Sequence, residues 1–167
     1  MGIAETAKQT KKASIQLAAV KTSVKNAALT QIAKALQQNS LQIISANEKD
    51  LAAAKKTNLA APLLKRLVFD KSKIADVCSG IESLIKLDDP VGQTLTATEL
   101  DKGLELYKVT CPIGVIGVIF ESRPDALVQI STLCLKSGNA VLLKGGSEAE
   151  NTNKILAEVI AKAAVSA

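Results

Sequence analysis

Apolar residues recur at helical spacing through most of the first 90 residues. Residues 3–25 are rich in Ala and Lys and carry a weak apolar stripe, which predicts one surface helix. The next segment repeats apolar residues at i, i+3, i+4 and i+7, a spacing that places them on one face of a helix. These residues are Leu29, Ile32, Ala33 and Leu36.

Three more helices are predicted before residue 90. Two of them cover residues 41–56 and 62–67. The third gives the clearest periodic signal, over residues 74–85, and Ser72 is its expected N-cap. Pro90 marks its end, because a proline disfavours helical geometry in the residue before it.

The pattern then changes to short β-prone runs. Residues 94–99 and 104–109 form two such runs, and the loop between them contains Gly103. A glycine near a short loop fits a hairpin that needs a positive φ. A two-stranded ribbon is stable only when it packs on something else. We therefore expect an arm that pairs subunits.

The last third of the chain predicts a β-α-β-α unit. Residues 113–120 are almost continuously apolar, as expected for a strand buried on both faces. A crossover helix over residues 125–136, a second parallel strand over residues 140–143 and a helix over residues 148–164 follow. Two parallel strands are too few for a doubly wound sheet, so we expect the front part of a longer protein.

The predicted class is therefore α/β, with an incomplete parallel sheet. The expected parts are a helical region (1–90), a hairpin arm (91–112) and the first β-α-β-α unit (113–167).

Composition narrows the class of protein. The chain has 167 residues, of which 47% are hydrophobic and 22% charged, as in an ordinary soluble domain. It has no apolar run long enough for a membrane helix and no apolar signal core at its N-terminus, which favours a cytoplasmic location. Three Cys, no His and no Cys-x-x-Cys pair argue against a disulfide framework and a metal site.

Charge is distributed unevenly. Residues 1–75 hold 13 Lys/Arg against 4 Asp/Glu, whereas residues 76–167 hold 8 against 12. A basic first half is compatible with a nucleic-acid surface or with solvated helix faces. The lysines are spread out and no aromatic stacking residues accompany them, so we favour solvated helices and expect no nucleic-acid partner.

The first candidate site is Lys144-Gly145-Gly146-Ser147-Glu148, which follows a predicted strand and opens a predicted helix. Amide N–H groups at such a helix start, together with Lys144, can hold a phosphate or a ribose. The alternative is an ordinary loop in which Ser147 caps the helix. Spacing alone leaves both interpretations open.

The second candidate is Glu121-Ser122-Arg123-Pro124, just past the first parallel strand. Arg123 offers a planar fork for a carboxylate or phosphate, and Ser122 offers a hydroxyl donor. In the alternative, Ser122 caps the following helix and Arg123 pairs with Glu121 or Asp125. The position at a strand end favours a functional role.

None of the three cysteines is a convincing nucleophile. Cys78 and Cys134 lie on predicted buried stripes, where apolar surroundings suppress the thiolate. Cys111 enters a strand beside Pro112, and no His is present to activate any thiol.

Two stretches resemble the γ-glutamyl phosphate reductase family, also called glutamate-5-semialdehyde dehydrogenase, within the aldehyde dehydrogenase superfamily. They run from Cys111 to Pro124 and from Cys134 to Ala149. The likeness extends over essentially the whole chain. It implies a Rossmann-like cofactor domain, a catalytic domain and an oligomerisation hairpin. It further implies NADPH-dependent reduction of γ-glutamyl phosphate to glutamate 5-semialdehyde with release of phosphate, in proline biosynthesis.

The resemblance also assigns roles to residues at the cofactor end. Lys144 matches the superfamily lysine that holds the adenosine ribose. Gly146, Ser147 and Glu148 would line the same end of an NADP(H) cofactor. An extra residue stands before Glu148 relative to the Lys-Pro-Ser-Glu of typical aldehyde dehydrogenases.

At the substrate end, Ser122 falls where many superfamily members place an oxyanion-hole Asn. Arg123 is our candidate for binding an anionic group of the acyl phosphate. The family's nucleophilic Cys is expected beyond Ala167, so we expect no catalysis by this chain alone. The expected partners are further copies of the same chain, in a homo-oligomer, and glutamate 5-kinase. The alternative is a non-catalytic fragment that binds cofactor or another subunit.

Overall fold

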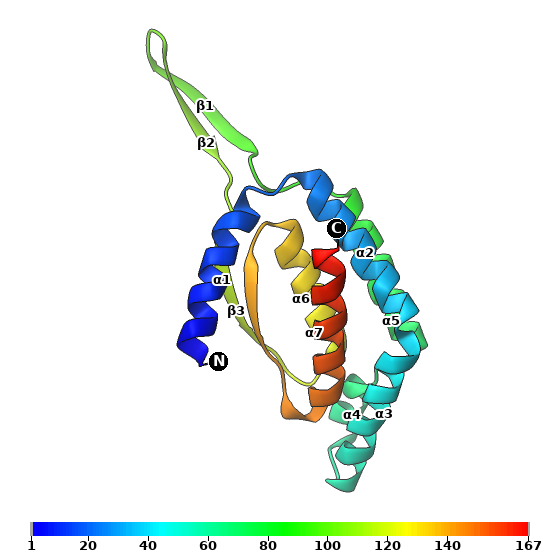
Figure 1. Ribbon diagram of the computed structural model, residues 1–167. Helices are drawn as coiled ribbons and strands as arrows, with labels where there is room; N and C mark the ends of the chain where they lie inside the picture. The colour runs from blue at the N-terminus through cyan, green and yellow to red at the C-terminus, as the bar shows by residue number, and fades with distance from the viewer. Residues whose placement is uncertain (1, 167) are drawn as a thin grey trace.

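The helices between residues 22 and 86 bury apolar faces, whereas Ile15, on the apolar stripe of the first helix, is 65% exposed. The computed structural model describes residues 2–166 and is a mixed α/β structure, as predicted (Figure 1). Its helices are α1 (Ile3–Ala18), α2 (Thr22–Gln38), α3 (Ser40–Lys56), α4 (Ala61–Leu67), α5 (Lys71–Lys86), α6 (Pro124–Lys136), the short 3-10 helix η1 (Ser147–Ala149) and α7 (Glu150–Val165). Its strands are β1 (Thr94–Asp101), β2 (Leu104–Val109), β3 (Val115–Ile119) and β4 (Ala140–Lys144).

The core lies between helices from both ends of the chain. The predicted stripe of α2 is buried, and Leu29, Ile32 and Leu36 pack in one cluster with residues of α5, α6 and α7. The stripe of α5 enters the same cluster, as predicted. α7 packs against α2 and α3, so the last helix covers two of the first (Figure 1).

The prediction of one helix over residues 3–25 is wrong. α1 ends at Ala18 and α2 begins at Thr22. The two helices have different partners, since α1 packs on β3 and β4 whereas α2 packs on α5, α6 and α7. The chain turns between them to reach both surfaces, although no Gly or Pro marks the turn.

The predicted cap of α5 is also wrong by two residues. Asp70 is the N-cap, and its carboxylate accepts a hydrogen bond from the Lys73 N–H at 3.0 Å. Ser72 lies inside the first turn of the helix, because the helix already begins at Lys71. An Asp in this position satisfies one of the free N–H groups of the helix start.

The predicted β-α-β unit is confirmed. β3 and β4 pair in parallel, from Val115 opposite Ala140 to Ile119 opposite Lys144, and α6 connects them. α1 lies on one side of the two strands, with α6 and α7 on the other (Figure 1). Burial of the first strand on both faces is wrong, however, because Ile113 and Ile119 are 82% and 87% exposed. A two-stranded sheet leaves its edges and strand ends uncovered.

The predicted hairpin is confirmed and projects from the rest of the molecule as an arm (Figure 1). β1 and β2 are antiparallel, and Gly103 in their turn has a φ of 78°. Every residue of both strands is exposed. The arm therefore owes its place to contacts at its base.

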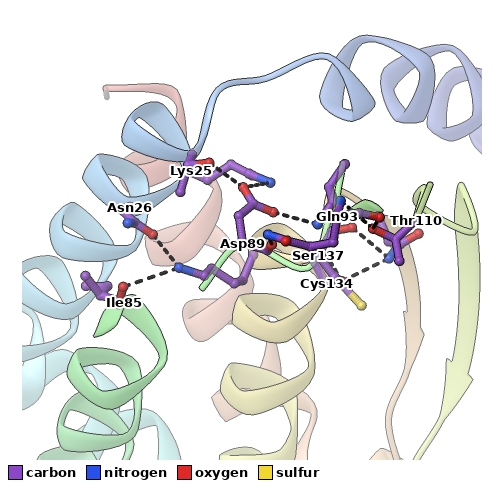
Figure 2. Close-up of polar contacts among 12 residues, drawn as sticks. Lys25, Asn26, Ile85, Asp89, Gln93, Thr110, Cys134 and Ser137 are labelled. Carbon is purple, nitrogen blue, oxygen red and sulfur yellow. Dashed lines mark hydrogen bonds and ion pairs between the residues drawn. The ribbon is translucent and has the colours of Figure 1, made fainter. Parts of the chain in front are cut away.

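Those contacts centre on Asp89 (Figure 2). Its carboxylate lies 2.5 Å from the Lys25 ammonium and accepts hydrogen bonds from the Thr22 hydroxyl at 2.7 Å and the Val91 N–H at 3.0 Å. The Lys25 and Asp89 side chains are only 2% and 11% exposed. Burial opposes ionisation, but the hydrogen bonds and the charge of Lys25 outweigh it and lower the pKa of Asp89. This ion pair joins α2 to the segment that leads into the arm.

A second buried lysine lies beside this pair. The Lys136 ammonium donates to the Asn26 side chain at 2.9 Å and to the Ile85 carbonyl at 3.3 Å, which ties the end of α6 to α2 and α5 (Figure 2).

Among residues 2–166, no helix combines the length and apolarity needed to span a membrane.

Candidate functional site

The carboxyl ends of β3 and β4 bring the two predicted loops together. The Phe120 N–H donates to the Lys144 carbonyl at 3.1 Å, just beyond the last paired residues of the strands. The loops after both strands therefore start side by side. In parallel α/β sheets this edge is where ligands bind.

Ser122 and Glu148 join the two loops directly. The Ser122 hydroxyl donates to the Glu148 carboxylate. This hydrogen bond is the main reason why the pKa of Glu148 lies below its usual value, with smaller contributions from its own N–H and the Lys144 charge. Ser122 was predicted for the substrate end and Glu148 for the cofactor end. The structure brings them together in one polar cluster, which also excludes a capping role for Ser122 in α6.

Two glycines allow the loops to approach this closely. A Cβ on Gly146 would overlap the Ser122 hydroxyl and lie 2.7 Å from Glu148 Oε2. A Cβ on Gly145 would lie 2.5 Å from Asn153 Nδ2 and 3.0 Å from the Phe120 ring. Only glycine fits at either position without a shift of the neighbouring groups.

Lys144 supplies a cation at the edge of this cluster. It is the last residue of β4, and its exposed ammonium donates to the Gly145 carbonyl at 3.1 Å. Together, Lys144, Ser122 and Glu148 offer an ammonium, a hydroxyl and a carboxylate. Such a set suits the hydroxyl groups of a ribose, since a carboxylate accepts from them and an ammonium donates to them.

The start of α7 is occupied by a carboxylate from α3. The Asp50 side chain accepts hydrogen bonds from the Asn151 N–H at 3.2 Å and side-chain amide at 2.8 Å, and from the Thr152 N–H at 2.8 Å and hydroxyl at 2.6 Å. Asp50 is 3% exposed. The Asn151 and Thr152 N–H groups are therefore already paired within the chain, and a ligand-binding role for the Lys144–Glu148 amides stays a prediction. The alternative, in which Ser147 caps the helix, is wrong, because Ser147 makes no capping hydrogen bond.

Sequence reasoning missed Asp50, although the sequence contains a signal. Ile43, Asn47, Asp50 and Ala54 follow at intervals of four, three and four, and all four are buried. Two polar residues on a buried helical stripe need polar partners. Asn47 has such partners, because its side-chain amide donates to the Leu67 carbonyl at 2.9 Å and accepts from the Phe69 N–H at 2.8 Å.

Arg123 is the N-cap residue of α6. Its guanidinium is 3.1 Å from the Asp125 carboxylate, and its side chain is about half exposed. Glu121 pairs instead with Arg66 at 2.9 Å. This geometry matches the alternative in which Arg123 pairs with Asp125. Its role toward a substrate stays a prediction.

Cys78 and Cys134 occupy the buried environments that their sequence positions predict, whereas Cys111 lies before the strand that it was predicted to enter. Cys78 and Cys134 are buried, and burial raises the pKa of both thiols, with the charge of Glu82 adding to the effect at Cys78. Cys111 is exposed between the arm and β3. Within residues 2–166, no group of three or more Asp, Glu or Cys side chains is arranged to hold a metal ion.

Comparison with known proteins confirms the resemblance that the two stretches predict. No protein-family model matches the chain. The chain is 66% identical over 163 residues to the γ-glutamyl phosphate reductase of Acetivibrio thermocellus, an alignment that covers 98% of the chain and 38% of that protein. The chain thus spans less than half the length of the curated relatives that it matches.

Solved structures agree with the sequence match. The γ-glutamyl phosphate reductase of Thermotoga maritima superposes with a TM-score of 0.94 at 36% identity, over 97% of this chain and 39% of that one. A NAD-dependent benzaldehyde dehydrogenase of Corynebacterium glutamicum shares the fold, with a TM-score of 0.69 at 19% identity, over 93% of this chain and 32% of that one. The predicted aldehyde dehydrogenase-like fold is therefore confirmed.

Proposed function

We propose that this chain forms the N-terminal, cofactor-binding part of a γ-glutamyl phosphate reductase, the family to which its sequence and fold are similar. The complete enzyme would reduce γ-glutamyl phosphate to glutamate 5-semialdehyde with NADPH and release phosphate, in proline biosynthesis. The observation that carries the proposal is the contact between the loops after β3 and β4, made by Ser122 and Glu148. It lies in a chain that is 66% identical to a protein of that name.

NADP(H) is the proposed cofactor, and when bound it supplies the hydride. The residues at the end of β4 fit its ribose, because Lys144 can donate to a ribose hydroxyl and Glu148 can accept from one. Ser122 holds the Glu148 carboxylate in place. Gly146 has no side chain, and a Cβ at its position would push the two loops apart.

The substrate is proposed to approach from the side of Ser122 and Arg123. Arg123 would bind an anionic group of the acyl phosphate, since a guanidinium matches phosphate and carboxylate geometry. It would then exchange its contact with Asp125 for one with the substrate. Ser122 would contribute its hydroxyl to the developing oxyanion by giving up its hydrogen bond to Glu148, since a hydroxyl has one proton to donate.

The remaining proposals concern assembly and location. The exposed arm is proposed to pair subunits into a homo-oligomer. Glutamate 5-kinase, which makes the acyl phosphate, is a proposed partner, and the cytoplasm is the proposed location. The alternative function is that of a fragment that binds cofactor or another subunit without catalysis.

The cofactor proposal is tested by measuring the binding of NADPH to the chain through the fluorescence of NADPH. We expect Lys144→Ala to weaken binding by at least tenfold, about 1.4 kcal/mol. Lys154→Ala is the matched control, because Lys154 is exposed on α7 and should leave affinity unchanged. Equal affinity of wild type and Lys144→Ala would exclude the proposed site.

A second assay tests whether the chain has any activity by itself. We expect no phosphate-dependent reduction of NADP⁺ by glutamate 5-semialdehyde with this chain, because Cys78 and Cys134 are buried and no His activates Cys111. Measurable turnover by the chain would refute this expectation.

A further inference from the structure

Asp50 places a negative charge of the protein itself at the start of α7. The sequence motif Lys144–Glu148, called the cofactor loop below, does not predict this charge. The first N–H groups of an α-helix are unpaired within the helix and carry a partial positive charge, so they attract anions. In this chain the Asp50 carboxylate receives four hydrogen bonds from Asn151 and Thr152, two of them from backbone N–H groups. An anion of the protein itself therefore already occupies this position.

Burial of Asp50 and Thr152 closes the two Thr152 donors to a second anion. Asp50 is 3% exposed and Thr152 is fully buried. Asn47 closes the inner side, because its amide donates to the Thr152 hydroxyl at 3.2 Å. A phosphate would have to displace a buried carboxylate that is held by donors from two successive residues.

The surface beside this position is acidic. A hollow of about 270 Å³ lies between α3 and the cofactor loop. Asp50, Glu148 and Glu150 line it, and no Lys or Arg does. Lys144, the cation of the loop, lies outside this lining. A ligand group that enters the hollow therefore meets acceptors and negative charge.

We propose that Asp50 is a specificity-determining residue, which excludes phosphate from the start of α7 and reserves the hollow beside the Lys144–Glu148 loop for uncharged, hydroxyl-bearing groups. Applied to the proposed cofactor, this means that the ribose hydroxyls face α7, whereas any phosphate on that ribose points toward Lys144. This application rests on the proposed function. The exclusion of phosphate by Asp50 does not.

The first test uses the unmodified chain and amide chemical shifts measured by NMR. Inorganic phosphate should leave the Asn151 and Thr152 amide signals unmoved. Adenosine 2′-phosphate should shift signals of Lys144 and Gly145, and its phosphate should add nothing to the shifts that adenosine alone produces at Asn151 and Thr152. Phosphate-dependent shifts at Asn151 and Thr152 in the unmodified chain would overturn the proposal.

The second test removes the internal anion. Asp50→Ala should lower Tm by roughly 10 °C, because it leaves buried donors unpaired. Formate or phosphate should then shift the Asn151 and Thr152 amides and recover part of the lost Tm. Glu48→Ala is the control, since Glu48 is exposed on the same helix and should show neither effect. Asp50→Ala that folds but gains no anion-dependent shift would contradict the proposal.

The two proposals fail in different ways. A chain that binds no NADPH but shows anion binding only after Asp50→Ala would disprove the cofactor site and support the role of Asp50. A chain that binds NADPH through Lys144 but takes up phosphate at Thr152 would support the cofactor site and disprove the role of Asp50. Should Asp50→Ala not fold, the measurements on the unmodified chain decide the question.

Discussion

At the scale of single residues, Gly146 is the position where one added atom has the clearest effect. Gly146→Ala places a methyl group against the Ser122 hydroxyl and the Glu148 carboxylate, so it forces the two loops apart. We expect a roughly tenfold loss of NADPH affinity. The change in Tm should be small, because the loop lies at the surface.

Gly80→Ala is the matched control for this substitution. Apart from the local backbone of α5, no atom lies within 4 Å of the position that its Cβ would take, and Gly80 is in the interior of α5. Alanine there should stabilise the chain by about 0.5–1 kcal/mol and leave affinity unchanged. NADPH affinity that survives in Gly146→Ala would show that contact between the loops is not required for binding.

Ser122 sets the ionisation of Glu148. Ser122→Ala removes the hydrogen bond that contributes most to the lowered pKa, so the pKa of Glu148 should rise toward its ordinary value of 4.5. Titration of the Glu148 side-chain carbonyl by NMR measures the shift. An unmoved Glu148 titration would mean that the hydrogen bond does not form in solution.

At the scale of elements, the Lys25–Asp89 pair connects α2 to the segment that leads into the arm. Asp89→Asn leaves the buried Lys25 ammonium without its counter-charge, which should cost about 3 kcal/mol of unfolding free energy at neutral pH. Asp88→Asn is the control, since Asp88 is exposed. Urea denaturation of both variants and wild type provides the comparison.

The same pair has a defined pH dependence. The pKa of Asp89 is lower in the folded chain than its ordinary value of 3.8. Its contribution to stability is therefore fully present above pH 3.8 and is lost as the pH falls through the lower, folded-state pKa. The stability difference between wild type and Asp89→Asn should shrink in that acidic range. A difference that stays constant down to acid unfolding would argue against the ion pair.

Elements with a strong period could be predicted from the sequence, and elements whose bounds depend on distant partners could not. The stripe of α5 from Ile74 to Ile81 predicts both the helix and its buried face, because helical spacing alone decides them. The break after Ala18 was missed, since no local residue requires it. It follows from the different surfaces on which α1 and α2 pack.

The candidate site shows the same limit. The positions of Lys144 and Ser122 at strand ends follow from local patterns, and the structure places both there. The Asp50 contact with Thr152 joins residues 102 positions apart, which no local pattern encodes. Only the polar interruption of the buried stripe of α3 indicates that such a partner exists.

At the scale of the whole molecule, the arm and the body are separable. The arm is exposed throughout, and its ends are held together by hydrogen bonds of 3.0 Å between Gly92 and Thr110 and between Thr110 and Gln93. Replacing residues 95–108 with a short glycine linker should therefore leave Tm nearly unchanged. The same deletion should dissociate any oligomer that the chain forms.

Size-exclusion chromatography with light scattering measures this outcome. A deletion variant with the association state of the wild type would disprove the proposed role of the arm in subunit pairing. A large drop in Tm would instead show that the arm stabilises the body. A variant with a polar turn substitution, Lys102→Gln, controls for the loss of charge at the tip of the arm.

The packing of α7 on α2 and α3 also determines when the chain can fold during synthesis. At about 5–20 residues per second, Thr152 is made roughly 5–20 s after Asp50. Until then the apolar stripe of α2 lacks one of its main partners, and Asp50 has none of its four donors. The nascent chain therefore presents an incomplete helical layer to chaperones for that interval. The Lys144–Glu148 loop and the packing of α2 and α3 on α7 become ordered in the same late step, when α7 emerges and docks.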